Sequence, residues 1–269
     1  AHKLAHLGLV SKTGAGTNTV RPGLFYDGVT TIVSGTANMS YDVAAFTAVS
    51  SRGGSAGAVF FANDGTVNVA TTAAPGTDSR IDVVYVWQRE FSLDGGTTGP
   101  VIGVVQGAVA ASPVAPSLSA FPGAIELARI TVPAGVTATN SGATITQTAP
   151  FTAVDGAPIP VRNVANLPTV AVPGSRARTI DTGVIYSWSG SAWTIPPIGL
   201  RQLVYFGVNG TFTKATYPWL RMIRVRCQGG GGGSAGHPAT AAGQGATGSP
   251  GGGGAYAELL ITDIAGLAA

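Results

Sequence analysis

Most apolar residues of this chain fall in short runs in which they alternate with polar residues. The clearest run is RIDVVYVWQRE at 80–90, where apolar residues stand at both odd and even positions. Because successive side chains of a strand point to opposite faces, this run predicts a strand that is buried on both faces. The run LARITV at 127–132 alternates as well and stops at Pro133, which cannot continue a central strand. Turn signals recur about every eight to twelve residues, which predicts an all-β, sandwich-like domain over residues 1–150.

Three glycine-containing turns separate pairs of these predicted strands. An Asp-Gly pair between apolar runs is a strong signal for a β-hairpin, so we expect the first two turns to close hairpins. Only residues 38–48 give an indication of a structure other than a strand. The turns are Asp27-Gly28 between runs 24–26 and 29–33, Asn63-Asp64-Gly65 between 58–62 and 66–70, and Asp94-Gly95-Gly96 before 100–106.

Three further segments follow the first domain. Residues 151–178 are rich in proline, valine and alanine without a clear period, which predicts an extended connector. Residues 179–199 contain GVIYSW and AWTI on either side of a Ser189-Gly190 turn, which predicts a small β unit with an aromatic core of two tryptophans. We expect residues 200–269 to form a glycine-rich C-terminal β domain.

A glycine-rich block lies between the two apolar runs of this last domain. Half of the residues from Gly229 to Gly254 are glycine, which loses more conformational freedom on folding than any other residue. The run RMIRVRCQ precedes the block, and AYAELLI resumes directly after it. A linker should join two domains, yet only a few residues follow the second run. We therefore expect an ordered or partly ordered excursion from a β-sheet, packed as extended left-handed glycine helices.

The composition favours a subunit of an assembly. Charged residues make up 10% of the 269 residues, against about a quarter in typical soluble domains. A free monomer needs a charged coat for solubility, whereas a subunit hides part of its surface in contacts. No apolar run is long enough to span a membrane, which excludes membrane insertion. The single cysteine, Cys227, lies on the apolar side of a predicted strand, where we expect it to be buried and structural.

Charge is unevenly distributed along the chain. Residues 1–155 hold seven Lys/Arg against nine Asp/Glu, and residues 156–269 hold eight against three. Five basic residues and no acidic residue lie between Arg201 and Arg226, which favours contact with a polyanion. Alternatively, this segment is a solvated face that an acidic part of a neighbouring subunit balances, and this is the more common situation.

Exposed aromatic and basic side chains in this segment could bind an anionic glycopolymer. Aromatic rings stack on sugars, and arginine binds phosphate through two parallel hydrogen bonds. The opposite interpretation is that the aromatic residues form the core of the terminal domain, which is the more common fate of such residues. The candidate ligand-binding residues are Lys214, Tyr217, Trp219, Arg221, Arg224 and Arg226.

The sequence gives little support for a catalytic, metal-binding or nucleotide-binding site. Asp78 and Asp82 share a strand face with Arg80, so we expect a structural salt bridge instead of a metal or catalytic site. The glycine block contains no lysine and leads into a strand, unlike a phosphate-binding loop. No nucleophile motif lies near a histidine. We therefore expect a protein that is not an enzyme, without a cofactor or a metal and without a nucleic-acid partner. The histidines, which are too scattered for a zinc site, are His2, His6 and His237.

Three segments carry a resemblance to a known family. The order of DSRID at 78–82, VIGVVQG at 101–107, SPVAP at 112–116 and LARITV resembles minor tail proteins of siphophages that infect actinobacteria, over about residues 59–133. GVIYSWSGSAWTI is similar to a small β unit of phage tail fibre chains. GTFTKATYPWLRMIRVRCQGGGGG with the returning AYAELL is similar to the glycine-rich terminal domain of tail fibre proteins.

The resemblance implies a receptor-binding or structural protein of the virion tail tip. Such a protein is a homotrimer, attaches through its N-terminal part to other tail or baseplate proteins, and faces the host envelope with its C-terminal part. A carbohydrate-binding adhesin that holds host cell-wall polysaccharide is the second interpretation, and a tail-associated hydrolase is the least supported. The family's glycine-rich domains continue through more strands, so the end at Ala269 leads us to expect a truncated or fragmentary terminal domain.

Overall fold

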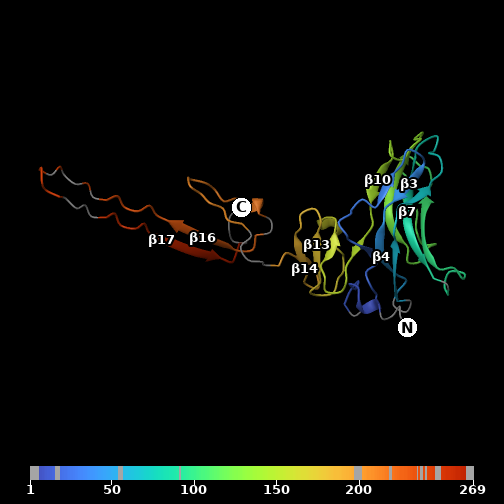
Figure 1. The fold of residues 1–269 in the computed structure, drawn as a ribbon, viewed down its shortest axis with the longest axis horizontal. Helices are drawn as coiled ribbons and strands as arrows, with labels where there is room; N and C mark the ends of the chain where they lie inside the picture. Colours follow the sequence, from blue (N-terminus) through green and yellow to red (C-terminus); the bar gives the residue numbers. More distant parts are fainter. Residues whose placement is uncertain are drawn as a thin grey trace. The chain divides into compact units, whose positions relative to one another are not determined.

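The computed structural model describes residues 6–15, 19–53, 57–90, 92–196, 202–217, 220–234, 236, 239, 241–245 and 250–264. Strands dominate these residues, and the helical segments among them are short 3-10 turns, which confirms the all-β prediction (Figure 1). The chain divides into two compact units, Ala1–Pro196 and Pro197–Ala269. Each unit is described by itself below.

Three sheets of the first unit surround its main core. The 3-10 turn η1 (His6–Gly8) precedes them. One sheet has the order β11–β1–β4–β5, with β11 (Phe151–Thr152), β1 (Gly23–Phe25), β4 (Phe46–Ser51) and β5 (Ala58–Asn63). The second has the order β10–β9–β7–β8, with β10 (Thr144–Gln147), β9 (Ile125–Pro133), β7 (Ser79–Arg89) and β8 (Gly99–Gln106). The third has the order β2–β3–β6, with β2 (Val33–Gly35), β3 (Ser40–Val43) and β6 (Val67–Ala70).

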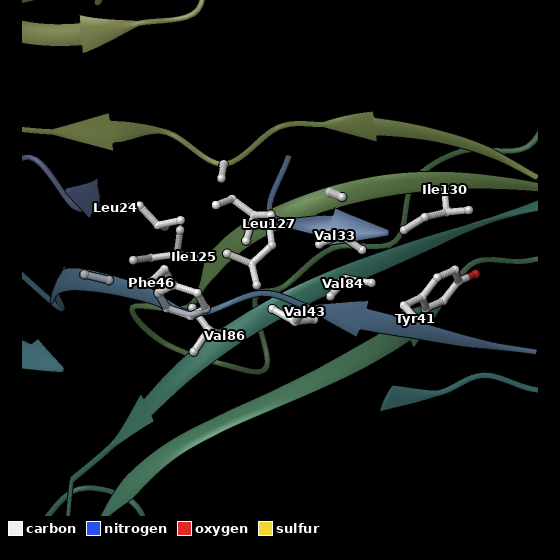
Figure 2. Packing of buried hydrophobic residues seen from close by; sticks show 14 of the residues in the cluster. Leu24, Val33, Tyr41, Val43, Phe46, Val84, Val86, Ile125, Leu127 and Ile130 are labelled. Carbon is white, nitrogen blue, oxygen red and sulfur yellow. The ribbon is translucent and has the colours of Figure 1, made fainter. Parts of the chain in front are cut away.

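Side chains from all three sheets meet in one hydrophobic core (Figure 2). β7 contributes to it on one face and is buried on the other face as well, which confirms the prediction for this strand. Apolar burial of this kind is the dominant favourable contribution to folding. The core residues labelled in Figure 2 are Leu24, Val33, Tyr41, Val43, Phe46, Val84, Val86, Ile125, Leu127 and Ile130.

Two of the predicted hairpins are wrong. The Asp27-Gly28 turn joins β1, which pairs with β4 and β11, to β2, which pairs with β3. Asn63-Asp64-Gly65 likewise joins β5 of one sheet to β6 of another. Both turns carry the chain from sheet to sheet, because the two strands that each turn joins pair with other strands and not with one another. Only Asp94-Gly95-Gly96 lies between directly paired strands, β7 and β8.

Residues 38–48 were expected to differ from a strand, and this prediction is also wrong. They form β3 and the start of β4. Tyr41 and Val43 are fully buried and alternate with Ser40 and Asp42, so a period-2 pattern is present but covers only four residues. Pairing of β3 with both β2 and β6 fixes this short run as a central strand.

Residues 151–196 form a fourth sheet and complete the first. β11 pairs in parallel with β1, so the expected connector begins as part of the first sheet. The fourth sheet has the order β12–β13–β14–β15, and the 3-10 turn η2 (Val164–Asn166) follows β12. Trp188 and Trp193 lie 5.4 Å apart between ring centroids, as expected for the small β unit. The strands are β12 (Ile159–Val161), β13 (Arg176–Thr179), β14 (Ile185–Trp188) and β15 (Trp193–Thr194).

The second unit contains the 3-10 turn η3 (Lys214–Thr216) and an antiparallel pair, β16 (Ile223–Gln228) and β17 (Tyr256–Ile261). The glycine block connects these paired strands and therefore does not separate two domains. Backbone hydrogen bonds continue into it, from Gly229 N to Ala255 O at 2.7 Å and from Gly232 N to Gly252 O at 2.9 Å. The block thus leaves the β-sheet and returns to it, as predicted, while its packing as left-handed glycine helices stays a prediction.

Cys227 is exposed, so the prediction that it is buried is wrong. It lies on the apolar side of β16, as its sequence pattern indicates. Within the described part of the chain, Val225 and Cys227 on that side are exposed, and only Ile223 is partly buried. The predicted alternation of β16 is therefore present, but the conclusion that its apolar face is buried by the same chain does not hold.

Candidate binding surface

One face of the β16–β17 pair brings two of the candidate residues together. Directly opposite residues of an antiparallel pair share a face, and the register places Arg226 opposite Glu258 and Arg224 opposite Leu260. The Nε atoms of Arg224 and Arg226 lie 3.3 Å and 3.1 Å from the two carboxylate oxygens of Glu258. We call this side the charged face, and it comprises Arg224, Arg226, Gln228, Tyr256, Glu258 and Leu260.

Glu258 is the electrostatic centre of the charged face. The hydroxyl of Tyr256 donates a hydrogen bond to its Oε2. This bond, together with the two arginines, holds the pKa of Glu258 below its ordinary value, and the same bond raises the pKa of Tyr256. Glu258 is therefore ionised at neutral pH and partly neutralises two guanidinium groups. Because the arginine side chains remain 55% and 59% exposed, the face can still attract an anion.

The other candidate residues lie in the segment before β16. Lys214 donates from Nζ to the carbonyl oxygen of Ile264 at 3.0 Å. The ring of Tyr217 stacks on Phe212, with centroids 5.0 Å apart and planes 6° apart. Arg221 is exposed just before β16. Trp219 lies outside the described residues.

The aromatic residues of this unit do not form a conventional core. Tyr205 is 88% exposed and Phe206 is 48% exposed. Phe212 and Tyr217 cover one another but neither is fully buried. The interpretation of these residues as the core of a terminal domain is thus not met within the described part of the chain.

Sequence reasoning missed Glu258 and Tyr256 as members of the site. The sequence alone indicates them only as the start of the returning strand. Their pairing with β16 depends on the register across a gap of 26 residues, from Gly229 to Gly254. The available signal was the alternation of Tyr256, Glu258 and Leu260, which places the acid on one face with the tyrosine.

Of the two candidate carboxylates in the first unit, Asp82 has a structural role. Asp82 is fully buried, and its Oδ1 accepts a hydrogen bond from Arg80 Nε at 2.8 Å, which confirms the predicted structural salt bridge. Its Oδ2 accepts from Tyr41 at 2.8 Å and from Thr71 at 2.6 Å. Burial, with the neighbouring Asp82 carboxylate, raises the pKa of Tyr41. Asp78 is exposed and has a left-handed backbone, with φ of 57°.

The histidines are not assembled into a site in the described part of the chain. His6 Nδ1 lies 3.2 Å from the carbonyl oxygen of Ala58, and its ring meets Phe60 edge-on. His2 and His237 lie outside the described residues. Among those that are described, no three His, Cys, Asp or Glu side chains gather closely enough to hold a metal.

Neither a membrane-crossing helix nor a known relative adds to this picture. Over the ranges given above, no helix is long and apolar enough to cross a membrane. Comparison of the chain with family models, with curated proteins and with solved structures gives no match. The charged face is therefore the arrangement from which a binding function can be argued, as a pair of exposed guanidinium groups that suits phosphate or carboxylate.

Proposed function

We propose that this chain is a structural, non-enzymatic protein of a phage tail tip or baseplate that contributes to host attachment as a homotrimer. In this role the N-terminal part attaches to other tail proteins, and the C-terminal part acts at the host surface. The resemblance of residues 59–133 and of the glycine-rich end to tail proteins is one source of the proposal.

The observation that carries the proposal is the contrast in burial between the two units. The first unit has its own hydrophobic core, in which Leu24 and Leu127 are almost fully buried. In the second unit, no described residue from 202 to 264 is buried. A two-stranded sheet alone is only marginally stable in water. A fold of this kind supports a subunit that completes its C-terminal part with other chains, as in a fibrous tail protein.

The direct test is the location of the chain in phage particles. Purified particles of the phage that encodes it are digested for mass spectrometry, and an antibody against the full chain is used for immunogold electron microscopy. We expect peptides of the chain in the particles and gold at the tail tip. Particles without such peptides, or gold confined to the head, would overturn the proposal.

The charged face favours a second candidate function, a carbohydrate-binding adhesin that holds an anionic wall glycopolymer. Arg224 and Arg226 project from one strand face at a spacing of two residues and stay more than half exposed. Their charge exceeds that of Glu258, which leaves attraction for a phosphate-bearing polymer. Hydrogen bonds to charged groups contribute about 1.5–3 kcal/mol each, so two such contacts would dominate the affinity.

A matched pair of double variants tests the adhesin function in the full chain. R224A/R226A removes the arginines of the charged face, and R176A/R178A removes two exposed arginines at the same spacing on β13. We expect sedimentation with purified actinobacterial cell walls to fall at least about tenfold for the first variant and little for the second. Equal loss in both would indicate nonspecific charge attraction, and wild-type protein that stays in solution would contradict the adhesin function.

A further inference from the structure

The second face of the β16–β17 pair is entirely apolar. Side chains alternate along a strand, and opposite residues of an antiparallel pair share a face. The register pairs isoleucine with isoleucine, then valine with leucine, then cysteine with alanine. We call this side the apolar face, and it comprises Ile223, Val225, Cys227, Ala257, Leu259 and Ile261.

Most of the apolar face is open to solvent within the described part of one chain, and only Ile223 and Ile261 at one end are partly buried. Leu259 is 60% exposed and Val225 is 38% exposed. Cys227 is exposed beside them. Contiguous apolar surface of this kind on a soluble protein marks a contact site. The two strands also lack a third strand in their sheet among the described residues, so cover on this face is what would stabilise the pair.

The distribution of charge favours another copy of the same chain as the occupant. The apolar face carries no charged side chain, so identical copies can meet there without burying like charges. The charged face carries two arginines against one glutamate, and copies meeting there would place excess positive charge together. A side without charged residues is the composition expected for the core of an interface, and the arginines of the opposite side stay in solvent.

The sizes of the side chains along the apolar face indicate how copies would be oriented. Large side chains lie at the Ile223–Ile261 end, and small ones lie at the Cys227–Ala257 end. Around a common rotation axis with all copies parallel, layers of equal size meet, large with large and small with small. The Cys227 side chains of all copies then fall into one layer.

We propose that the apolar face of β16 and β17 is the interface through which copies of this chain assemble in parallel about a common axis, with Cys227 of every copy buried in one layer. This inference rests on the proposed function only for the number of copies, which is three. The inference places the contact between the copies of the proposed trimer on one specific face.

Cys227 provides a direct readout because the chain has no other cysteine. In the assembled full-length protein, we expect it to react with a maleimide at least about tenfold more slowly than in denaturant, since only opened or dissociated chains expose it. Reaction in the native protein as fast as in denaturant would overturn the proposal.

A matched pair of variants tests the face itself. L259D places a charge on the apolar face, and L260D places one on the charged face, at a neighbouring residue of similar exposure, 60% against 50%. Native mass spectrometry should show L259D as single chains of about 26.8 kDa, and wild type and L260D as oligomers. The circular dichroism spectrum of the full-length protein should change little in both, because both positions lie outside the first unit. Single chains for the wild type, or equal dissociation of both variants, would overturn the interface.

Failure of the proposed interface can be distinguished from failure of the proposed function. Protein that assembles through the apolar face but is absent from phage particles would leave the interface standing and remove the tail function. Protein present in particles whose L259D variant still forms trimers would keep the tail function and remove the interface.

Discussion

Close approach of two backbones in the glycine block leads to a sharp prediction for single alanine substitutions. A Cβ on Gly254 would overlap the carbonyl oxygen of Gly229, and a Cβ on Gly251 would overlap that of Gly232. The opposed atoms are backbone, so no side chain can turn away to make room. A Cβ on Gly253 would meet no heavy atom within 4 Å, and its backbone is outside the left-handed region. Gly253→Ala is therefore a matched control.

The size of the expected destabilisation follows from the backbone hydrogen bonds that lie beside the overlapping atoms. Gly254→Ala must displace the backbone that makes the hydrogen bond from Gly229 N to Ala255 O. Gly251→Ala must likewise displace the backbone that makes the hydrogen bond from Gly232 N to Gly252 O. Loss of one such bond costs about 0.5–1.5 kcal/mol. With some residual strain, we expect about 1–2 kcal/mol of local destabilisation, or about five- to thirtyfold. Gly253→Ala should instead stabilise slightly, by up to about 1 kcal/mol, because it restricts the unfolded chain.

Hydrogen exchange of the assembled full-length protein is the appropriate assay, because it reports local opening. Peptides that cover residues 229–233 should exchange faster in Gly251→Ala and Gly254→Ala, and at the wild-type rate or more slowly in Gly253→Ala. Peptides from β7 serve as an internal reference and should not change. Equal exchange in all three variants, or full exchange of the whole block in the wild type, would refute the reasoning that glycine is required for close packing.

Two further predictions concern buried and exposed charges. Asp82→Ala leaves the buried Arg80 without its ion-pair partner and should lower the free energy of unfolding, measured with denaturant, by about 3–5 kcal/mol. Glu126→Gln removes an exposed ion pair and should lower it by at most about 1 kcal/mol. Equal losses would contradict the assigned burial. Tyr256→Phe should raise the pKa of Glu258 toward its ordinary value, because the tyrosine hydrogen bond is the main cause of its lowering. NMR titration measures this pKa, and an unchanged value would contradict that cause. Since the folded pKa of Glu258 is lowered, its contribution to the strand pair is present above the unfolded pKa and is lost as pH falls through the folded value.

The strands of the first unit were predictable where the alternation was long. β7 spans Ser79–Arg89 and β9 spans Ile125–Pro133, and both have the burial that their patterns indicated. The pairing was not predictable in the same way. Whether an Asp-Gly turn closes a hairpin or carries the chain to another sheet depends on partners such as β11, which lies far along the chain from β1. Local turn chemistry contains no information about that distant partner.

The candidate site shows the same limit. Basic residues of β16 were identified from their alternation, but the acid that organises them lies beyond the glycine block. Arg226 and Glu258 become neighbours only through the register of the strand pair. The opposite holds for Asp82, whose partner Arg80 lies two residues away on the same strand face. Contacts within a strand can therefore be read from sequence, and contacts across a long excursion require the fold.

Cys227 shows most clearly what an alternating pattern can and cannot predict. Its alternation with Arg226 indicates a strand with one apolar side, and β16 has that form. The same pattern does not say which chain covers the apolar side, because the hydrophobic effect depends on area removed from water and not on the source of the cover. In the first unit the cover comes from the same chain, as for Leu127. Where the chain leaves such a face exposed, the failed expectation of burial indicates a contact site, and the lack of charge on that face is the reason for which we propose another copy as the partner.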